Sequence, residues 1–373
     1  LLLLMSGLSF LAGESPAGAE EPDAETVDAA SWPGTQKGLV WFWQNNEATN
    51  SIEDEKGRTL RTCRVVARDR ARFGRFHDML LSGGAVLADQ ADGMLLKSFK
   101  AADGLTIEAL ITPAEAKKDE PKRIITFSTD LKNRNFSVSQ DGRKLMLQLR
   151  TTENAKQDKT KPIALGSIPA GKPTHVVLTY APGDLKVYFN GKCVRTLQTV
   201  DGTFANWRKS HLLFGDEFKG GADWSGRLEH VAIYSRALEA AEVARKYKLI
   251  AGELKKRKPV EKIVVEAKLV ATSETPDPKE LVKEAYRRCL VMYGYEVKKV
   301  VSGKLTSRKF SAGHWAILDA KKIPLKLEKG RTYRLTLHPW DAHPELTGER
   351  RADDLPNEYF DHPMLFDPTP VRE

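Results

Sequence analysis

Short extended runs, each closed by a turn signal, follow one another from residue 38 to residue 234. Two tight turns stand out, Asp141-Gly142 and Asn190-Gly191, and both join alternating runs in the way that β-hairpins do. Parallel strands need long crossover connections, and no helical stretch is evident between these runs. The sequence therefore predicts two antiparallel sheets packed face to face. The predicted strands are 39–43, 105–111, 123–127, 136–139, 145–149, 175–180, 185–189, 192–196, 212–215 and 228–234.

A helix and a second unit follow this series. An apolar stripe begins near Leu238, with acidic residues early and basic residues late, as the helix dipole favours. A basic run and Pro259 end it, so we expect a basic linker over residues 251–261. Residues 262–373 then predict a small β domain, a barrel or a sandwich, with an irregular tail from Leu355. Its predicted elements are strands at 263–270, 289–297, 314–318 and 333–337 and a short helix at 276–284.

The first residues are apolar, and Ala17-Gly18-Ala19 follows them as a small-residue cleavage signature. We interpret residues 1–19 as part of a signal peptide and residues 20–37 as a flexible leader. No other segment is apolar enough to cross a bilayer. The prediction is a secreted, periplasmic or cell-envelope protein without a membrane span once the signal is removed.

Charge argues against a nucleic-acid partner. The chain of 373 residues carries 59 basic and 50 acidic side chains, a net charge of +9. The basic residues are scattered apart from 255–258, whereas nucleic-acid binding needs a concentrated basic face. Three cysteines are too few for a disulfide framework. A Cys63–Cys193 bridge stays open, although burial as small hydrophobic residues is the preferred interpretation.

The stretch from Gly226 to Leu238, GRLEHVAIYSRAL, resembles the closing signature of laminin-G-like, concanavalin A-like jelly-roll domains. Glu229 and His230 stand where that family has Asp and Glu. Further segments are similar to other motifs of the family, namely 39–43, 73–83, 105–113, 175–180 and 187–191. The resemblance covers about residues 38–250. It implies an all-β, concanavalin A-like antiparallel sandwich, here followed by the helix and the second small β domain.

The resemblance also implies a binding module of the extracytoplasmic space. Such modules take a polysaccharide or a protein partner, and often hold a calcium ion. The hypothesis is therefore an exported, non-catalytic protein that binds its partner through edge loops of the sandwich, with no required cofactor. Fold alone does not supply a ligand.

Catalysis is the alternative. Laminarinase-type glycosidases share the sandwich and carry E-x-D-x-(x)-E on one strand, where alternation brings the carboxylates together. That pattern occurs only at 21–25, in the leader, where Pro22 interrupts it. The acids Glu108, Asp184 and Glu229 are isolated in their strands. A glycoside hydrolase or lyase with an unfamiliar acid pair, or a structural component of the cell envelope, remain the other hypotheses.

Sugar binding needs an exposed aromatic face beside planar polar groups. Trp207 and Trp224 are the candidates because both lie in polar loop contexts, and Asn206 and Arg208 flank the first. The alternative is that each indole plugs an edge of the sandwich.

Two further clusters of side chains are candidate metal sites. Asp216, Glu217 and Asp223 lie close in sequence and are the candidate calcium ligands, with a solvated acidic loop as the alternative. His338 and His343 bracket an aspartate and could offer imidazoles to a metal. The prolines beside them favour a rigid loop that closes the small domain.

Overall fold

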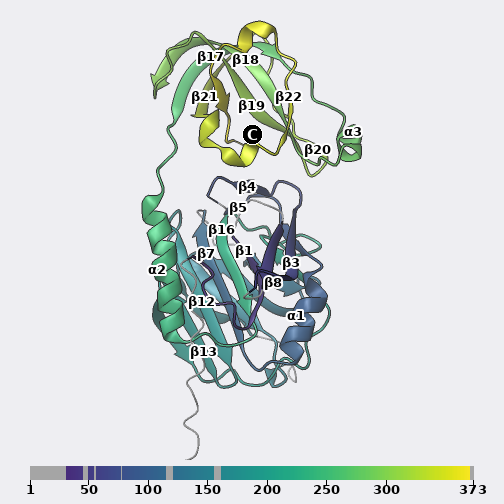
Figure 1. Cartoon of the computed structure of the whole chain (residues 1–373), viewed down its shortest axis with the longest axis vertical. Helices are drawn as coiled ribbons and strands as arrows, with labels where there is room; N and C mark the ends of the chain where they lie inside the picture. The colour runs from purple at the N-terminus through teal and green to yellow at the C-terminus, as the bar shows by residue number, and fades with distance from the viewer. Residues whose placement is uncertain are drawn as a thin grey trace, which may run out of the picture.

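The computed structural model describes residues 31–44, 49–53, 56–76, 78–114, 121–154 and 161–369. They form two β bodies arranged end to end (Figure 1). A sandwich of two sheets lies below, and a smaller barrel lies above it. The long helix α2 runs along the sandwich and leads into the extended linker that enters the barrel.

The first sheet of the sandwich has the strand order β14-β13-β12-β7-β16-β5-β4, and β1 pairs with β16 as well. All its pairings are antiparallel. Every residue of β7 is buried, because the sandwich core covers one face of this sheet and α2 packs on the other. The strands are β1 Leu39–Trp43, β4 Arg72–Gly74, β5 Asp78–Leu81, β7 Leu105–Pro113, β12 Thr174–Ala181, β13 Asp184–Phe189, β14 Lys192–Leu197 and β16 Gly226–Tyr234.

The second sheet has the order β11-β10-β9-β8-β15-β6-β3-β2 and is also antiparallel. Its apolar side chains alternate toward the first sheet, with Phe127, Phe136 and Leu147 among the most buried. The strands are β2 Thr49–Glu53, β3 Thr59–Ala67, β6 Val86–Asp89, β8 Lys122–Ser128, β9 Arg134–Asp141, β10 Lys144–Leu149, β11 Ile163–Ser167 and β15 His211–Phe214.

One helix of the sandwich domain was not predicted. Helix α1, Ala91–Lys100, lies between β6 and β7 and buries Ala91, Leu95 and Phe99. These residues recur at every fourth position, so they share one face of the helix. Only these three residues form the apolar stripe, and Gly93 lies within the segment, so the sequence pattern did not indicate a helix.

Helix α2, Ala240–Lys256, begins at a reciprocal cap between Glu239 and Glu242. It continues to Lys256, so the first half of the predicted linker 251–261 is wrong. The physical reason is that Leu254 packs on the sandwich core and extends the apolar stripe of Val243 and Ile250 by one turn.

The upper body is a closed barrel of five strands. Its circuit runs β18-β19-β23-β21-β17 and back to β18, with β20 and β22 added at the edges. The predicted tail is not wholly irregular, because β23 pairs in parallel with β19. The elements are β17 Ile263–Thr272, α3 Pro278–Lys283, β18 Cys289–Ser302, β19 Lys309–Leu318, β20 Lys321–Lys322, β21 Thr332–Pro339, β22 Arg350–Ala352 and β23 Met364–Phe366, with single 3-10 turns at Trp340–Ala342, Pro344–Leu346 and Asn357–Tyr359.

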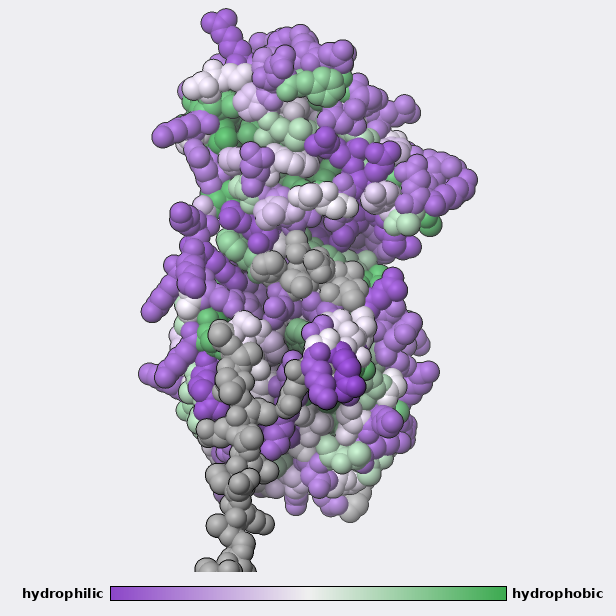
Figure 2. Space-filling model, viewed as in Figure 1, coloured by the Kyte–Doolittle hydropathy of each residue, from purple (hydrophilic) through white to green (hydrophobic). Residues whose placement is uncertain are grey.

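The predicted fold class is confirmed: an antiparallel concanavalin A-like sandwich, a helix and a second small β domain. The predicted signal, 1–19, lies outside the described residues. The leader prediction is wrong where the structure describes it, because Trp32 is buried in the core of the sandwich. Among the described helices, none combines the length and hydropathy that crossing a bilayer requires. The face drawn in Figure 2 is mostly hydrophilic, with hydrophobic residues in small separate groups.

Candidate functional site

Both predicted tryptophans are part of the sandwich interior. Trp207 and Trp224 are each 1% exposed. The Trp207 ring lies among Phe99, Phe136 and other aromatic rings, and its Nε1 donates to the Arg150 carbonyl at 2.7 Å. The expectation that these indoles offer a free face to a sugar ring is wrong, because the core takes up both faces.

The polar neighbours of Trp207 are occupied as well. The Asn206 amide donates to the Thr151 carbonyl at 2.7 Å. The backbone N–H of Arg208 donates to Asn135 at 3.0 Å, and the Arg208 side chain is exposed. This loop is therefore held in place by its own polar groups, and of the four predicted ligand-binding residues only Arg208 keeps an exposed side chain.

The three predicted calcium ligands are close together but differently engaged. Arg123 donates to Glu217 at 2.9 Å, and Ser128 also hydrogen-bonds to that carboxylate. Asp216 accepts the backbone N–H groups of Glu217 and Ala222, each at 2.7 Å. Burial raises the pKa of Asp223, and the neighbouring Asp216 raises it further. Glu217 thus has an arginine partner, and a calcium ion at this loop stays an untested prediction.

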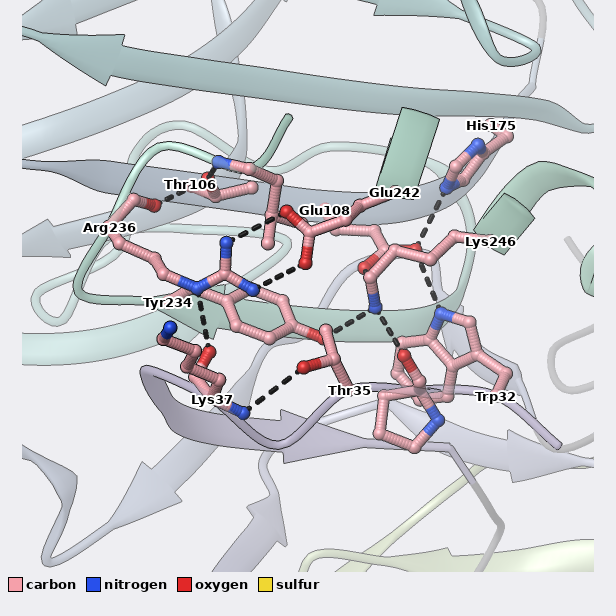
Figure 3. A network of polar contacts seen from close by, with 12 residues as sticks. Trp32, Thr35, Lys37, Thr106, Glu108, His175, Tyr234, Arg236, Glu242 and Lys246 are labelled. Atoms are coloured by element: carbon pink, nitrogen blue, oxygen red, sulfur yellow. Dashed lines mark hydrogen bonds and ion pairs between the residues drawn. The ribbon is translucent and has the colours of Figure 1, made fainter. Parts of the chain in front are cut away.

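A buried ionic network fixes α2 on the first sheet (Figure 3). Glu108 of β7 accepts Trp32 Nε1 at 2.8 Å and lies 2.9 Å from Nε2 of His175. Its second oxygen lies 3.1 Å from Nζ of Lys246, which also donates to the Tyr234 hydroxyl at 2.6 Å. Glu108 and His175 are fully buried. Because Lys246, His175 and Trp32 compensate the buried charge of Glu108, we assign the network a structural role.

Electrostatics in this network favour the ionised carboxylate. Burial alone would raise the pKa of Glu108, but Lys246 and His175 outweigh it and lower the pKa to about 2. Sequence analysis missed this network, because Lys246 is one of several basic residues late in the predicted helix. Its position on the buried stripe with Val243 and Ile250 is the signal that reveals it.

Among the described residues, a pocket lies between the sandwich and the barrel. Its volume is about 300 Å³, within the range of small-ligand sites. The strands β4, β5 and β16 of the sandwich form its floor, at the end of the sandwich that faces the barrel (Figure 1). The linker and the barrel form the rest. The lining includes Arg72, Phe73, Arg75, Phe76, Asp78, Leu80, Arg227, Val260, Lys262, Trp315, His338, His343, Glu345, Leu346 and Phe366.

Strand register arranges the floor. Arg72 of β4 pairs with Leu80 of β5, which pairs with Arg227 of β16. Residues opposite each other on neighbouring strands point to the same face, so the two arginines flank Leu80 in one row. Within the described part of the chain, neither guanidinium has a hydrogen-bond or ion-pair partner. Arg72 is only 9% exposed, and its Nη1 is buried without a hydrogen bond.

The buried charge of Arg72 is costly in this position. Burial and, to a lesser extent, the nearby Arg288 lower its pKa to about 10, whereas Asp78 acts in the opposite direction. Isolated buried charges cost several kcal/mol unless something pairs with them. An anion in the pocket would supply such a pair.

Asp78 is the acidic group of the floor. It is 2% exposed and accepts the Phe76 backbone N–H at 3.1 Å. Burial raises its pKa to about 6, and repulsion from Glu229 contributes. Gly74 faces it across β4 and β5, and a Cβ there would lie 2.4 Å from the Asp78 carboxylate. The glycine therefore makes the space in which this carboxyl group sits.

The barrel contributes a chain of hydrogen bonds to the pocket wall. Glu345 lies 2.7 Å from Nδ1 of His343, and Nε2 of His343 lies 2.9 Å from Nδ1 of His338. When His343 is neutral, an ionised Glu345 accepts its Nδ1–H, and His343 Nε2 is then the acceptor for His338 Nδ1–H. His338 is then left with an unprotonated Nε2. Burial lowers the pKa of His338 to about 4, and His343 adds to the effect, so the ring is neutral at physiological pH.

The predicted histidine pair is thus real, but its chemistry differs from the one considered. His338 Nδ1 and His343 Nε2 hydrogen-bond to each other, and the carboxylate beside His343 is that of Glu345 and not that of Asp341. Within the described residues no cluster of three or more metal-ligating side chains is found. The sequence analysis missed Arg72 and Asp78, which lie on strands of three and four residues, and Arg227, which lies at the start of β16.

Comparisons with known proteins agree with the fold. Residues 88–244 match the protein-family model described as the concanavalin A-like lectin/glucanases superfamily. No curated protein matches the chain. Among solved structures, the Trypanosoma rangeli sialidase is 19% identical, with 56% of this chain and 32% of that chain covered and a TM-score of 0.39. This chain therefore spans about a third of the length of that enzyme.

A second similar structure is the receptor binding domain of the botulinum neurotoxin C/D mosaic serotype. It is 12% identical, with 82% of this chain and 72% of that chain covered and a TM-score of 0.44. The family match and the two-sheet topology agree that the lower body is a concanavalin A-like, laminin-G-like jelly roll.

Proposed function

We propose that this protein is a non-catalytic, extracytoplasmic binding protein that takes a glycan in the pocket between its jelly roll and its barrel. The observation that carries the proposal is the 300 Å³ pocket with the unpaired, nearly buried Arg72 in its floor. A pocket that holds a costly unpaired charge gains stability from a complementary ligand. The apolar, small-residue sequence of residues 1–19 supports export.

A glycan suits the lining better than a purely apolar ligand. Phe73 and Phe76 are partly exposed aromatic residues of the lining, and arginine, aspartate and histidine groups lie beside them. Sugar rings present apolar C–H faces and many hydroxyl groups, so they need both kinds of contact. The family description, which joins lectins and glucanases, supports the same ligand class. A folded protein partner would need a larger surface than this pocket provides.

The proposal moves the binding site away from the loop around Trp207. Purified protein should bind at least one class of oligosaccharide on a glycan array, and isothermal titration should give a measurable Kd. Arg72→Gln should weaken that binding, while Arg208→Gln should leave it unchanged. The proposal fails if no glycan binds, or if Arg208→Gln abolishes binding and Arg72→Gln does not. Co-purification with envelope proteins in the absence of glycan binding would favour the structural hypothesis.

An enzyme is the second candidate, favoured by one observation. The Glu345–His343–His338 chain leaves an unprotonated imidazole nitrogen on a residue that lines the pocket, and such a nitrogen is a suitable general base. Incubation of the protein with the oligosaccharide that binds best distinguishes the two. Intact oligosaccharide after prolonged incubation supports binding alone, and shortened products that disappear in His338→Gln would establish an enzyme.

A further inference from the structure

The lining of the pocket has more cationic than anionic side chains. Four lining side chains are cationic, Arg72, Arg75, Arg227 and Lys262, against the carboxyl groups of Asp78 and Glu345. Glu345 is engaged by His343. We propose that the pocket recognises an acidic sugar residue, whose carboxylate binds between Arg72 and Arg227. This inference rests on the proposed glycan-binding function and specifies the ligand class.

Strand geometry sets the spacing of the two guanidinium groups. Arg72 and Arg227 occupy one row with a single strand, β5, between them. Adjacent strands are about 4.8 Å apart, so the two Cα atoms are about 10 Å apart. Two arginine side chains at this spacing can reach toward one group above Leu80. A ligand there would contact both guanidinium groups.

A carboxylate fits this arrangement better than an ammonium or a neutral hydroxyl group. The guanidinium group is planar and offers paired N–H donors that match the two oxygens of a carboxylate. Asp78 lies in the same floor, and its carboxylate disfavours a ligand with more than one negative charge. A single negative charge balances the excess in the pocket with less repulsion from Asp78 than a doubly charged phosphate would meet.

The barrel side of the pocket supplies a complementary group. The hydrogen-bond chain from Glu345 leaves His338 Nε2 as an acceptor. Among the described residues, nothing donates a hydrogen bond to that nitrogen. A sugar hydroxyl is the donor that fits it. A sugar acid carries both required features on one ring, a carboxylate for the sandwich side and hydroxyl groups for the barrel side.

The test compares three matched ligands by isothermal titration calorimetry with the full chain. They are a neutral oligosaccharide, the same oligosaccharide with uronic acid residues, and a sulfate ester of the neutral oligosaccharide. We expect the uronate to bind at least about tenfold more tightly than the neutral sugar, since hydrogen bonds to charged groups are the stronger ones. Arg72→Gln and Arg227→Gln should each remove this preference. Arg143→Gln, an exposed hairpin arginine outside the pocket, is the matched control.

The outcomes separate this inference from the proposed function. Equal affinity for the neutral sugar and the uronate would overturn the acidic-sugar inference while glycan binding stands. Tighter binding of the sulfate ester would overturn the choice of carboxylate. Binding of none of the three, together with an empty glycan array, would overturn the proposed function itself. Arg72→Lys guards against misfolding as the explanation, because it keeps the charge and should retain part of the preference.

Discussion

At the residue scale, two buried charges in this protein have opposite surroundings. Glu108 is surrounded by Lys246, His175 and Trp32, and all three stabilise its ionised form. Arg72 has no comparable partner within the described residues. A fully compensated charge indicates a structural role, whereas an uncompensated charge beside a cavity indicates a ligand. This contrast is the reason for placing the site between the two bodies and not under α2.

Glu108→Gln should destabilise the protein strongly, by about 3–5 kcal/mol, because it leaves the Lys246 ammonium buried without its counter-charge. The wild-type protein should also lose stability in acid. The pKa of Glu108 is lowered to about 2 from 4.5, so its contribution is complete above about pH 4.5 and is lost as the pH falls toward 2. Urea titrations of both proteins at several pH values measure the two effects. An unchanged midpoint in Glu108→Gln would contradict the assigned role.

Asp78 should show the opposite dependence on pH. Its folded pKa is raised to about 6 from 3.8, so the ionised carboxylate penalises the folded state at neutral pH. As the pH falls through 6 toward 3.8, this penalty disappears. Asp78→Asn keeps the acceptor for the Phe76 N–H and should stabilise the protein at pH 7.5, by at most about 3 kcal/mol. The gain should be absent near about pH 4. A loss of stability at pH 7.5 would show that the Asp78 charge is paired.

The same variant should change ligand binding. The groups that face Asp78 are Glu229, Arg227, Arg257 and Arg72, and its ionised form competes with a bound anion for the arginines. Asp78→Asn should therefore tighten the binding of an acidic sugar at pH 7.5 and remove most of the pH dependence between pH 5 and pH 7.5. Titration calorimetry across that range checks this, and a parallel pH dependence in both proteins would refute it.

At the element scale, most long strands were predicted and most short ones were not; the exceptions are the largely exposed β3, which was missed, and the four-residue β15, which was predicted. Alternation and turn signals placed the long strands such as β7, β12 and β16, because each has enough buried positions to show a pattern. The strands β4 and β5 have three and four residues. A pattern with a period of two has no statistical weight over so few residues, although these strands carry the floor of the pocket.

Helix α2 offers a test of its cap. Glu242 accepts the Glu239 backbone N–H at 2.9 Å and pairs with Arg236. Glu242→Ala should lower the free energy of unfolding by about 1–2 kcal/mol, since it removes the cap and the ion pair. Glu242→Gln keeps an acceptor at the cap and should cost less. Chemical denaturation of the two variants beside the wild-type protein gives the comparison, and equal losses would show that the cap contributes nothing.

At the scale of the whole molecule, the pocket requires both bodies. Contacts join them beside it: the Asp69 N–H donates to Asp319 at 3.0 Å, Lys321 pairs with Asp69 at 2.5 Å, and Arg288 lies over the Phe73 ring. Sequence analysis could predict each body separately, from its own periodicity and from the family resemblance. It could not predict a site made of residues that are some 250 positions apart, because spacing along the chain carries no information about such a contact.

Ligand binding should therefore protect two distant segments at once. Hydrogen exchange followed by mass spectrometry should show slower exchange in residues 72–81 and in residues 338–346 when the acidic oligosaccharide is added. The segment 204–208, where the sequence placed the site, should exchange at an unchanged rate and serves as the internal control. Protection of only one body would mean that the ligand binds outside the shared pocket.

The most direct measurement is a crystal structure of the full chain with its tightest-binding oligosaccharide. Our account predicts one sugar residue above Leu80, with its carboxylate on Arg72 and Arg227 and a hydroxyl group near His338. Sugar bound at the loop around Trp207, or on the outer face of the second sheet, with the pocket left empty would contradict it.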